Sequence, residues 1–181
     1  MIGEEERRFV VEQLASSEAQ VVEVTDGLNE AQWNFSESPE RWSIAENVEH
    51  LILFEGFIRG AVERALREPA APEKCAAVAE KHARVMGLVD VGGQRLNARE
   101  VVRPAGLWTD RDASLAEFRR VRAETIEFAR VTDADLRTHF FPHISFGDLD
   151  CYQWLLVLGT HALRHVKQIE TVKCNSTFPA A

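Results

Sequence analysis

Apolar residues recur at three- and four-residue steps in four long stretches of this sequence, and this spacing places them on one face of an α-helix. The four stretches cover residues 4–28, 44–68, 109–129 and 150–173. Each is long enough for several helical turns and has one apolar face to bury. Four amphipathic helices of this length predict an all-α fold, a four-helix bundle whose apolar faces share one core.

The predicted helices carry signals at their ends. Ser43 followed by Glu46 is a capping-box pattern directly before an apolar run, and Asp150 followed by Gln153 fits the same pattern. Pro69 stops the second helix, because proline lacks the N–H that a helix interior needs. The first helix has two candidate terminators, Gly27 and Asn29. These signals support the boundaries given above.

The connections between the helices are long for a compact domain, and about forty residues separate the second helix from the third. Within them, Pro72–Met86 is rich in alanine and predicts a short extra helix. Gly87–Trp108, with its Gly92-Gly93 pair, predicts an irregular crossover, and Val131–Leu149 predicts another loop. Because short loops alone give simple up-and-down bundles, long connections predict that some neighbouring helices are parallel. Without repeats or linkers, residues 1–181 are expected to form a single domain.

Composition excludes several classes of partner. A net charge of -8 argues against a nucleic-acid backbone or an anionic membrane surface. The N-terminal residues lack a signal-peptide pattern, and the apolar run Trp154–Gly159 is too short to span a bilayer. The three cysteines form no CxxC pair, which favours a reducing compartment; they are Cys75, Cys151 and Cys174. We therefore expect a cytoplasmic protein whose partners are small molecules, metal ions or a second copy of the chain.

Three histidines predict a metal site inside the bundle. His161 and His165 lie four residues apart on one stripe of the fourth helix, so that both rings can reach one ion. His50 lies on a stripe of the second helix beside its main apolar face and also points toward the core. Three imidazoles that meet in mid-bundle leave a coordination position for water or substrate, which is typical of catalytic rather than structural metal sites.

The spacing leaves a second interpretation open, in which these histidines are ordinary core or surface residues. His139 and His143 have the same spacing, but Pro142 interrupts any helix there, so their rings do not stack on adjacent turns. His143 could itself reach the mouth of the site. The alternative for His143 is a solvent-exposed position in a loop.

Two polar residues are candidates for orienting the ligands as outer partners of the metal. Glu46 precedes His50 by four residues and could accept a hydrogen bond from its ring, although its capping-box role is the alternative. Gln168 lies on the same stripe as the two histidines of the fourth helix. Trp42 and Trp154 are expected to anchor the core rather than to bind substrate.

Two segments resemble the signatures of a known family. Residues 42–51, Trp-Ser-Ile-Ala-Glu-Asn-Val-Glu-His-Leu, are similar to the W-S-x-x-E-x-x-x-H-L segment that opens the second helix of the DinB-like superfamily. Residues 161–169 are similar to its fourth-helix signature, H-x-x-x-H-x-x-Q-I. Residues 101–106 and 142–147 resemble its crossover and pre-helix loops, so the resemblance covers most of the chain.

The resemblance implies an up-up-down-down four-helix bundle, often a homodimer. It also implies a divalent metal held by three histidines, which match His50, His161 and His165 of this chain. Characterised members include S-transferases and isomerases that use low-molecular-weight thiols such as mycothiol or bacillithiol. A thiol cosubstrate is therefore an expectation that comes from the resemblance alone.

The leading functional hypothesis is a metal-dependent transferase or hydrolase. The ion would lower the pKa of a water toward about 7 or hold a thiol as thiolate, so that no protein nucleophile is needed. Substrate specificity would come from the crossover and the 131–149 loop. The alternatives are a non-catalytic metal or small-ligand binding dimer with a role in stress, and a structural dimer with a vestigial site. Zn, Ni, Fe and Co suit three imidazoles nearly equally, so the metal stays open.

Overall fold

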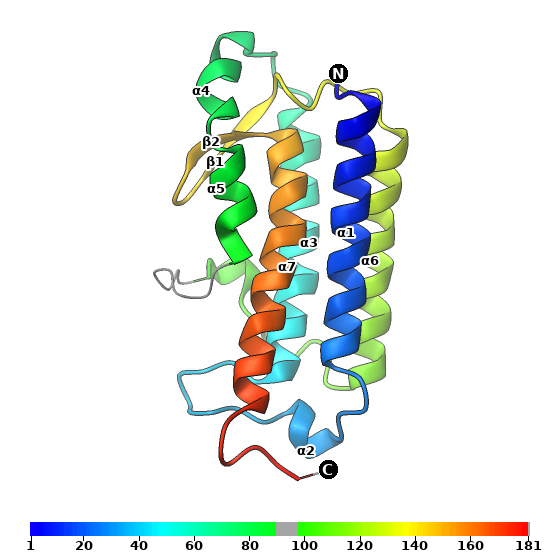
Figure 1. Ribbon diagram of the computed structural model, residues 1–181, viewed down its shortest axis with the longest axis vertical. Helices are drawn as coiled ribbons and strands as arrows, with labels where there is room; N and C mark the ends of the chain where they lie inside the picture. The colour runs from blue at the N-terminus through cyan, green and yellow to red at the C-terminus, as the bar shows by residue number, and fades with distance from the viewer. Residues whose placement is uncertain (90–97, 181) are drawn as a thin grey trace.

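Four long helices pack side by side in the computed structural model, which describes residues 1–89 and 98–180 (Figure 1). They are α1 (Glu4–Val24), α3 (Ile44–Ala65), α6 (Arg111–Val131) and α7 (Cys151–Lys173). The predicted all-α fold is confirmed, and the long helices lie where the apolar periodicity placed them. The Gly92-Gly93 part of the predicted crossover lies outside the described residues.

The predicted capping boxes begin two of these helices. Ser43 N–H donates to the Glu46 carboxylate at 2.7 Å, and Glu46 N–H donates to Ser43 Oγ at 3.2 Å. Asp150 and Gln153 exchange the same pair of bonds at the start of α7. Each pair satisfies backbone N–H groups that have no partner inside the helix, which fixes the residue at which the helix begins.

The first helix ends earlier than predicted. α1 stops at Val24, and Gly27 lies beyond it with φ +68°, a left-handed conformation that glycine adopts readily. Asn29 does not terminate α1 but caps a short helix that the sequence patterns did not indicate, α2 (Glu30–Trp33). Asparagine serves in both positions, so its type alone did not distinguish them.

Hydrogen bonds at both ends of α1 show that α7 runs parallel to it. Tyr152 Oη, at the start of α7, donates to the Glu6 carbonyl near the start of α1 at 3.2 Å. Lys173 Nζ, at the end of α7, donates to the Val24 carbonyl at the end of α1 at 2.8 Å. These two helices are therefore parallel neighbours over their whole length (Figure 1).

The other two long helices run in the opposite direction. Arg7 Nη1, near the start of α1, donates to the Ala129 carbonyl near the end of α6 at 2.8 Å. Asn47, near the start of α3, contacts His165 in the second half of α7. In chain order the helices run up, down, down, up, which corrects the up-up-down-down order implied by the resemblance (Figure 1).

The connections explain this order. Residues 25–43, which contain α2, cross one end of the bundle, and residues 132–150 cross the opposite end (Figure 1). Each joins helices that run in opposite directions. The described parts of the connection between α3 and α6, residues 66–89 and 98–110, instead lie along the bundle, and the second part ends where α3 began. The connection therefore joins two parallel helices, as its length predicted.

The connections carry short elements of their own. The predicted extra helix is divided into a 3₁₀ turn (Pro72–Lys74), α4 (Cys75–Ala79) and α5 (His82–Met86). The loop predicted over 131–149 contains an antiparallel hairpin of β1 (Phe140–His143) and β2 (Gly147–Asp150), with Pro142 opposite Asp148. A two-stranded hairpin has only edge strands, so a proline can occupy one without breaking a further ladder.

A buried polar layer separates the hydrophobic core into two clusters, one near the starts of α1 and α7 and the other near their ends. At its centre, Arg122 and Glu55 form an ion pair at 2.9 Å, with both side chains 1% exposed. Arg122 also donates to Ser17 Oγ at 2.8 Å and to the carbonyls of Leu14 and Leu158 at 3.2 and 3.3 Å. One guanidinium therefore links all four long helices.

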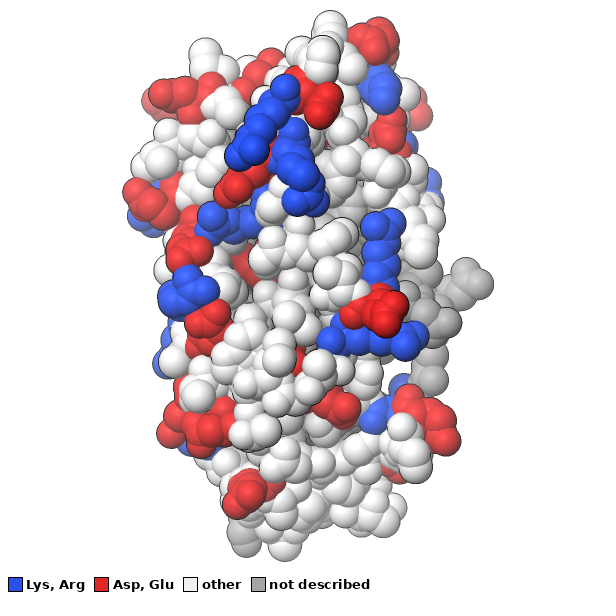
Figure 2. Space-filling model, turned by 180° about the vertical axis from the view of Figure 1, so that it is seen from behind, with Lys and Arg blue, Asp and Glu red and all other residues white. Residues whose placement is uncertain are grey.

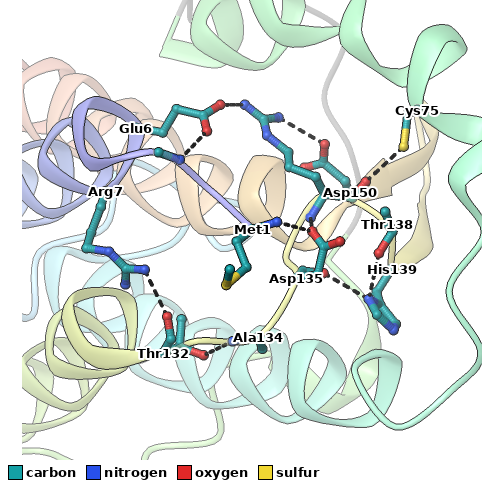
Figure 3. A network of polar contacts seen from close by, with 12 residues as sticks. Met1, Glu6, Arg7, Cys75, Thr132, Ala134, Asp135, Thr138, His139 and Asp150 are labelled. Atoms are coloured by element: carbon teal, nitrogen blue, oxygen red, sulfur yellow. Dashed lines mark hydrogen bonds and ion pairs between the residues drawn. The ribbon is translucent and has the colours of Figure 1, made fainter.

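A second polar network closes the end of the bundle where α1 and α7 begin (Figure 3). Arg137 donates both to Glu6 of α1 and to Asp150, the cap of α7. Burial raises the pKa of Glu6, but the hydrogen bonds from Arg137 and the Gly3 N–H, together with the charge of Arg137, outweigh it and hold the pKa below its usual value. Cys75 Sγ contacts the Arg137 carbonyl, which attaches α4 to the same network.

Basic and acidic side chains alternate on the face seen in Figure 2. Ion pairs such as Arg59–Glu124 and Arg120–Glu117 join neighbouring or successive turns on α3 and α6. This face therefore does not present a uniformly positive surface. Among the described residues, no helix combines the length and the apolar character needed to cross a membrane.

Candidate metal centre

Three histidines from α3 and α7 meet at one place in the bundle, where His50 contacts Val102 of the connection between α3 and α6. His50 and His165 are each 4% exposed, and His161 is half-buried. The Nε2 atom of His161 lies 3.4 Å from Nε2 of His50 and 3.2 Å from Nε2 of His165. One nitrogen from each ring lies within 4.8 Å of the other two. The structure thus brings the three predicted histidines into one group.

Hydrogen bonds on the far side of two rings fix where their protons lie. His50 Nδ1 lies 2.6 Å from the Val102 carbonyl oxygen, which only accepts, so Nδ1 carries the proton. His165 Nδ1 lies 2.7 Å from Asn47 Oδ1. The Asn47 amide cannot be reversed, because its Nδ2 donates to the Ser43 carbonyl at 2.8 Å. Both rings therefore direct an unprotonated Nε2 toward the centre of the group.

The converging nitrogens fit a divalent ion. Lone pairs that share one small volume repel each other unless a proton or a cation lies between them. Two nitrogens bound at about 2.05 Å in a tetrahedral site are about 3.3 Å apart, close to the 3.4 and 3.2 Å distances here. Within the described part of the chain, no cysteine or carboxylate joins the group. Three neutral imidazoles suit a transition metal and leave a fourth position open.

Aromatic rings line the histidine group. The Phe54 ring centroid lies 4.1 Å from that of His161, and Trp42 lies 4.7 Å from His50 and stacks nearly parallel to His165 at 6.2 Å. Trp42 was expected to anchor the core but is half-buried against these ligands. His161 Nδ1 is buried without a hydrogen-bond partner among the described residues. This apolar wall limits the access of solvent to the rings.

His143 lies beside the group at the end of β1. Its ring stacks on Phe146 at 4.6 Å and tilts against Trp154, a buried core residue as predicted, at 5.2 Å. Burial and then the charge of Arg99 lower the pKa of His143 to about 4. Burial is also the largest cause that lowers the pKa of His161, and the charge of His143 is among the others. The two rings are therefore close enough to interact electrostatically.

The other candidates from the sequence have different partners. The Glu46 carboxylate belongs to the capping box at the start of α3, and among the described residues the partner of His50 Nδ1 is the Val102 carbonyl rather than Glu46. Gln168 is half-buried on α7 and makes no hydrogen bond to the three histidines among the described residues. His139 binds the backbone of its own loop and lies outside the group, as the proline between it and His143 suggested.

Sequence reasoning missed the two groups that orient the ligands, Asn47 and the Val102 carbonyl. Asn47 carried a usable signal, because it is a polar residue three positions before His50 on the same helical stripe. It is 3% exposed and would be costly to bury without a partner. Val102 carried no such signal in the sequence, because every residue has a backbone carbonyl.

The histidine group makes the metal-free protein sensitive to acid. Burial lowers the pKa of His50, His161 and His165 below the usual 6.5, and neighbouring positive charges lower it further for the last two. Below about pH 6.5 the unfolded chain therefore binds more protons than the folded protein. The stability that the neutral histidines contribute is fully present above this pH and is lost as the pH falls through their folded pKa values. We expect the free energy of unfolding to fall by up to about 4 kcal/mol per pH unit, because each of three protons contributes about 1.4 kcal/mol.

Urea unfolding of chelator-treated protein at several pH values between 7.5 and 5 measures this slope. A His161→Leu variant has one such group fewer, so its stability should fall less steeply by about a third. Equal slopes for the two proteins would contradict the assignment of a neutral His161 with a lowered pKa in the folded protein.

A comparison with known protein families matches residues 13–169 to the DinB superfamily. A search of curated proteins found no match, and neither did a search of solved structures. The matched range contains His50, His161 and His165, together with both segments whose signatures resemble this family. The chain therefore belongs to the DinB superfamily.

Proposed function

We propose that this protein is a metal-dependent enzyme in which His50, His161 and His165 hold one divalent ion, and that it adds a low-molecular-weight thiol or water to an electrophilic small molecule. The observation that carries the proposal is the convergence of three Nε2 atoms with no fourth side chain among the described residues. An ion in such a site supplies Lewis acidity, which makes a water or thiol acidic enough to react at neutral pH.

The charges around the site favour an anionic nucleophile. The groups that orient His50 and His165 are a backbone carbonyl and an amide oxygen, both neutral. The donor set therefore leaves the double positive charge of the ion uncompensated, and a thiolate or hydroxide would reduce it. The buried Cys151 does not supply that thiolate, because burial and then the charge of Asp150 raise its pKa to about 12. A reactive thiol would have to come from a cosubstrate.

Access to the site is proposed on the side of His161, the most exposed of the three ligands. His143 and Phe146 of the hairpin then border the entrance. The Nδ1 atom of His143 accepts a hydrogen bond from Ser145 N–H at 3.1 Å. With its low pKa, this ring is neutral near pH 7 and keeps its proton on Nε2. We assign it the role of a hydrogen-bond donor that orients the substrate.

The test is to load metal-free protein separately with Zn²⁺, Ni²⁺, Fe²⁺ and Co²⁺. Each form is assayed for the transfer of small thiols to an electrophile and for the hydrolysis of an activated ester. We expect saturable turnover of one substrate class with at least one metal, and its loss in His161→Ala but not in His139→Ala. Protein that holds one ion per chain without turnover would support the alternative, a non-catalytic metal or ligand binding protein.

Two further properties belong to the proposal. The family resemblance implies a homodimer, which sedimentation equilibrium at several protein concentrations measures. The reduced state of the cysteines fits a cytoplasmic location, where thiols stay reduced. The dimer measurement is independent of the metal site.

A further inference from the structure

A short segment of the crossover, Val102–Leu107, is bound to the turn of α3 that carries His50. We name this segment the strap. The carboxylate of Glu49, which is 2% exposed, accepts three hydrogen bonds from consecutive backbone N–H groups of the strap. The donors are Ala105 at 2.8 Å, Gly106 at 3.0 Å and Leu107 at 3.1 Å. Glu49 thus fastens one end of the strap to the helix.

The strap forms a concave cradle for an anion. Gly106 has φ +73°, a left-handed conformation that lets successive N–H groups turn toward one point. Bonds from N–H groups to an ionised carboxylate are about twice as strong as those between neutral groups. A glutamine at position 49 would offer one acceptor oxygen and place its NH₂ group against N–H donors. The cradle is therefore specific for a carboxylate.

The other end of the strap reaches the metal centre. Val102 is 3% exposed, and its carbonyl oxygen lies 2.6 Å from His50 Nδ1. That carbonyl can hold the His50 proton only while the strap is docked on α3. Glu49 and His50 are adjacent in sequence, yet the Glu49 carboxylate binds the strap and not the ring. Any effect of Glu49 on the ring therefore passes through the strap.

We propose that Glu49 is a positioning residue for the metal centre: by docking the strap, it keeps the Val102 carbonyl against His50 Nδ1 and so keeps His50 Nε2 free for the ion. This rests on the proposed three-histidine metal site. Docking and metal binding are then coupled, and each strengthens the other by the same factor. The strap is part of the site although none of its atoms is a ligand.

The first test measures Zn²⁺ affinity by competition with a chromophoric chelator. We expect Glu49→Gln to weaken binding about 10- to 100-fold, the range typical of outer partners of metal ligands. Gly106→Pro changes the strap itself instead of its acceptor, because proline lacks the N–H and cannot adopt φ +73°. This variant should weaken Zn²⁺ binding in the same range. Glu46→Gln is the matched control: it removes one negative charge near His50 and keeps its capping box, so affinity should stay unchanged.

The second test needs no metal. Long-range ¹H–¹⁵N NMR correlations identify which nitrogen of each histidine carries the proton. In metal-free Glu49→Gln, we expect His50 to change from the Nδ1–H form to a mixture, whereas His165, held by Asn47, stays in the Nδ1–H form. Hydrogen exchange of the amides of 105–107 should become faster in this variant, and Zn²⁺ should slow it only in the wild-type protein.

The outcomes separate this inference from the proposed function. If wild-type protein binds one Zn²⁺ per chain and both strap variants bind it equally well with His50 still in the Nδ1–H form, the role of Glu49 is wrong and the metal site stands. If wild-type protein binds none of Zn²⁺, Ni²⁺, Fe²⁺ and Co²⁺, the proposed function fails. The NMR and exchange measurements on metal-free protein then still decide whether Glu49 sets the state of His50.

Discussion

The His161→Ala protein is expected to lose the ability to hold one divalent ion per chain. His161 supplies the nitrogen that lies within 3.4 Å of both other ligand nitrogens, so its removal leaves two donors and opens the site to water. Loss of an outer partner costs about 10- to 100-fold in affinity, and loss of a ligand should exceed that range. Zn²⁺ titration against a competing chelator, together with metal content after gel filtration, measures the effect.

The matched control is His139→Ala, which removes a histidine whose spacing to His143 equals that of His161 to His165. His139 binds the backbone of its own loop and lies outside the group, so its removal should leave Zn²⁺ affinity unchanged. Circular dichroism verifies that both variants fold. Full metal content in His161→Ala, or equal losses in the two variants, would show that the ligands are assigned wrongly.

The largest expected loss of stability comes from Arg122→Met. This change keeps most of the buried volume but removes the guanidinium that links the four long helices, and it leaves Glu55 buried without its ion-pair partner. Burial already raises the pKa of Glu55, and the charge of Arg122 is the largest of the effects that oppose that rise. Breaking a buried ion pair from one side costs about 3–5 kcal/mol. Urea unfolding at pH 7.5 measures the difference in free energy.

Two further variants serve as controls for this measurement. Arg120→Met removes an exposed partner of Glu117 and Glu124 on the same helix and should change stability little. The double variant Arg122→Met, Glu55→Leu removes both charges and should recover stability relative to Arg122→Met alone. If Arg122→Met were no less stable than Arg120→Met, the polar layer would not hold the helices together as described.

The long helices could be predicted because their signals are local. Ser43 with Glu46 and Asp150 with Gln153 are short patterns whose hydrogen bonds form within one turn. The spacing of His161 and His165 likewise predicts that both rings share a helix face, and the structure confirms that they do. Each inference needed only the geometry of a single helix, which the sequence specifies directly.

Features that depend on contacts between distant segments could not be predicted in this way. Apolar periodicity is the same for a helix read in either direction, so it does not encode the up, down, down, up order. The orientation of His50 depends on the backbone carbonyl of Val102, 52 residues away. Because every residue has a carbonyl, the residue type at position 102 does not indicate this contact. Glu49 was not singled out from the sequence, and its burial is explained by the docked strap, whose N–H groups bind its carboxylate.

The hairpin before α7 escaped prediction for a different reason. Its strands have four residues each, and Pro142 in the first of them argues against a strand. That argument holds for central strands, whereas Pro142 lies on an edge and is exposed. The same proline correctly excluded a helix through His143, so the sequence indicated what this segment is not rather than what it is.

Titration of metal-free protein with Co²⁺, followed by its visible absorption, tests the central claim most directly, because these bands report the number and type of ligands around the ion. The three-histidine site predicts saturation at one Co²⁺ per chain, bands of a four- or five-coordinate ion with nitrogen ligands, and a shift when a small thiol is added. The His161→Ala protein should show none of these bands. Wild-type protein whose Co²⁺ spectrum matched that of the free aqueous ion, or matched that of His161→Ala, would contradict the account.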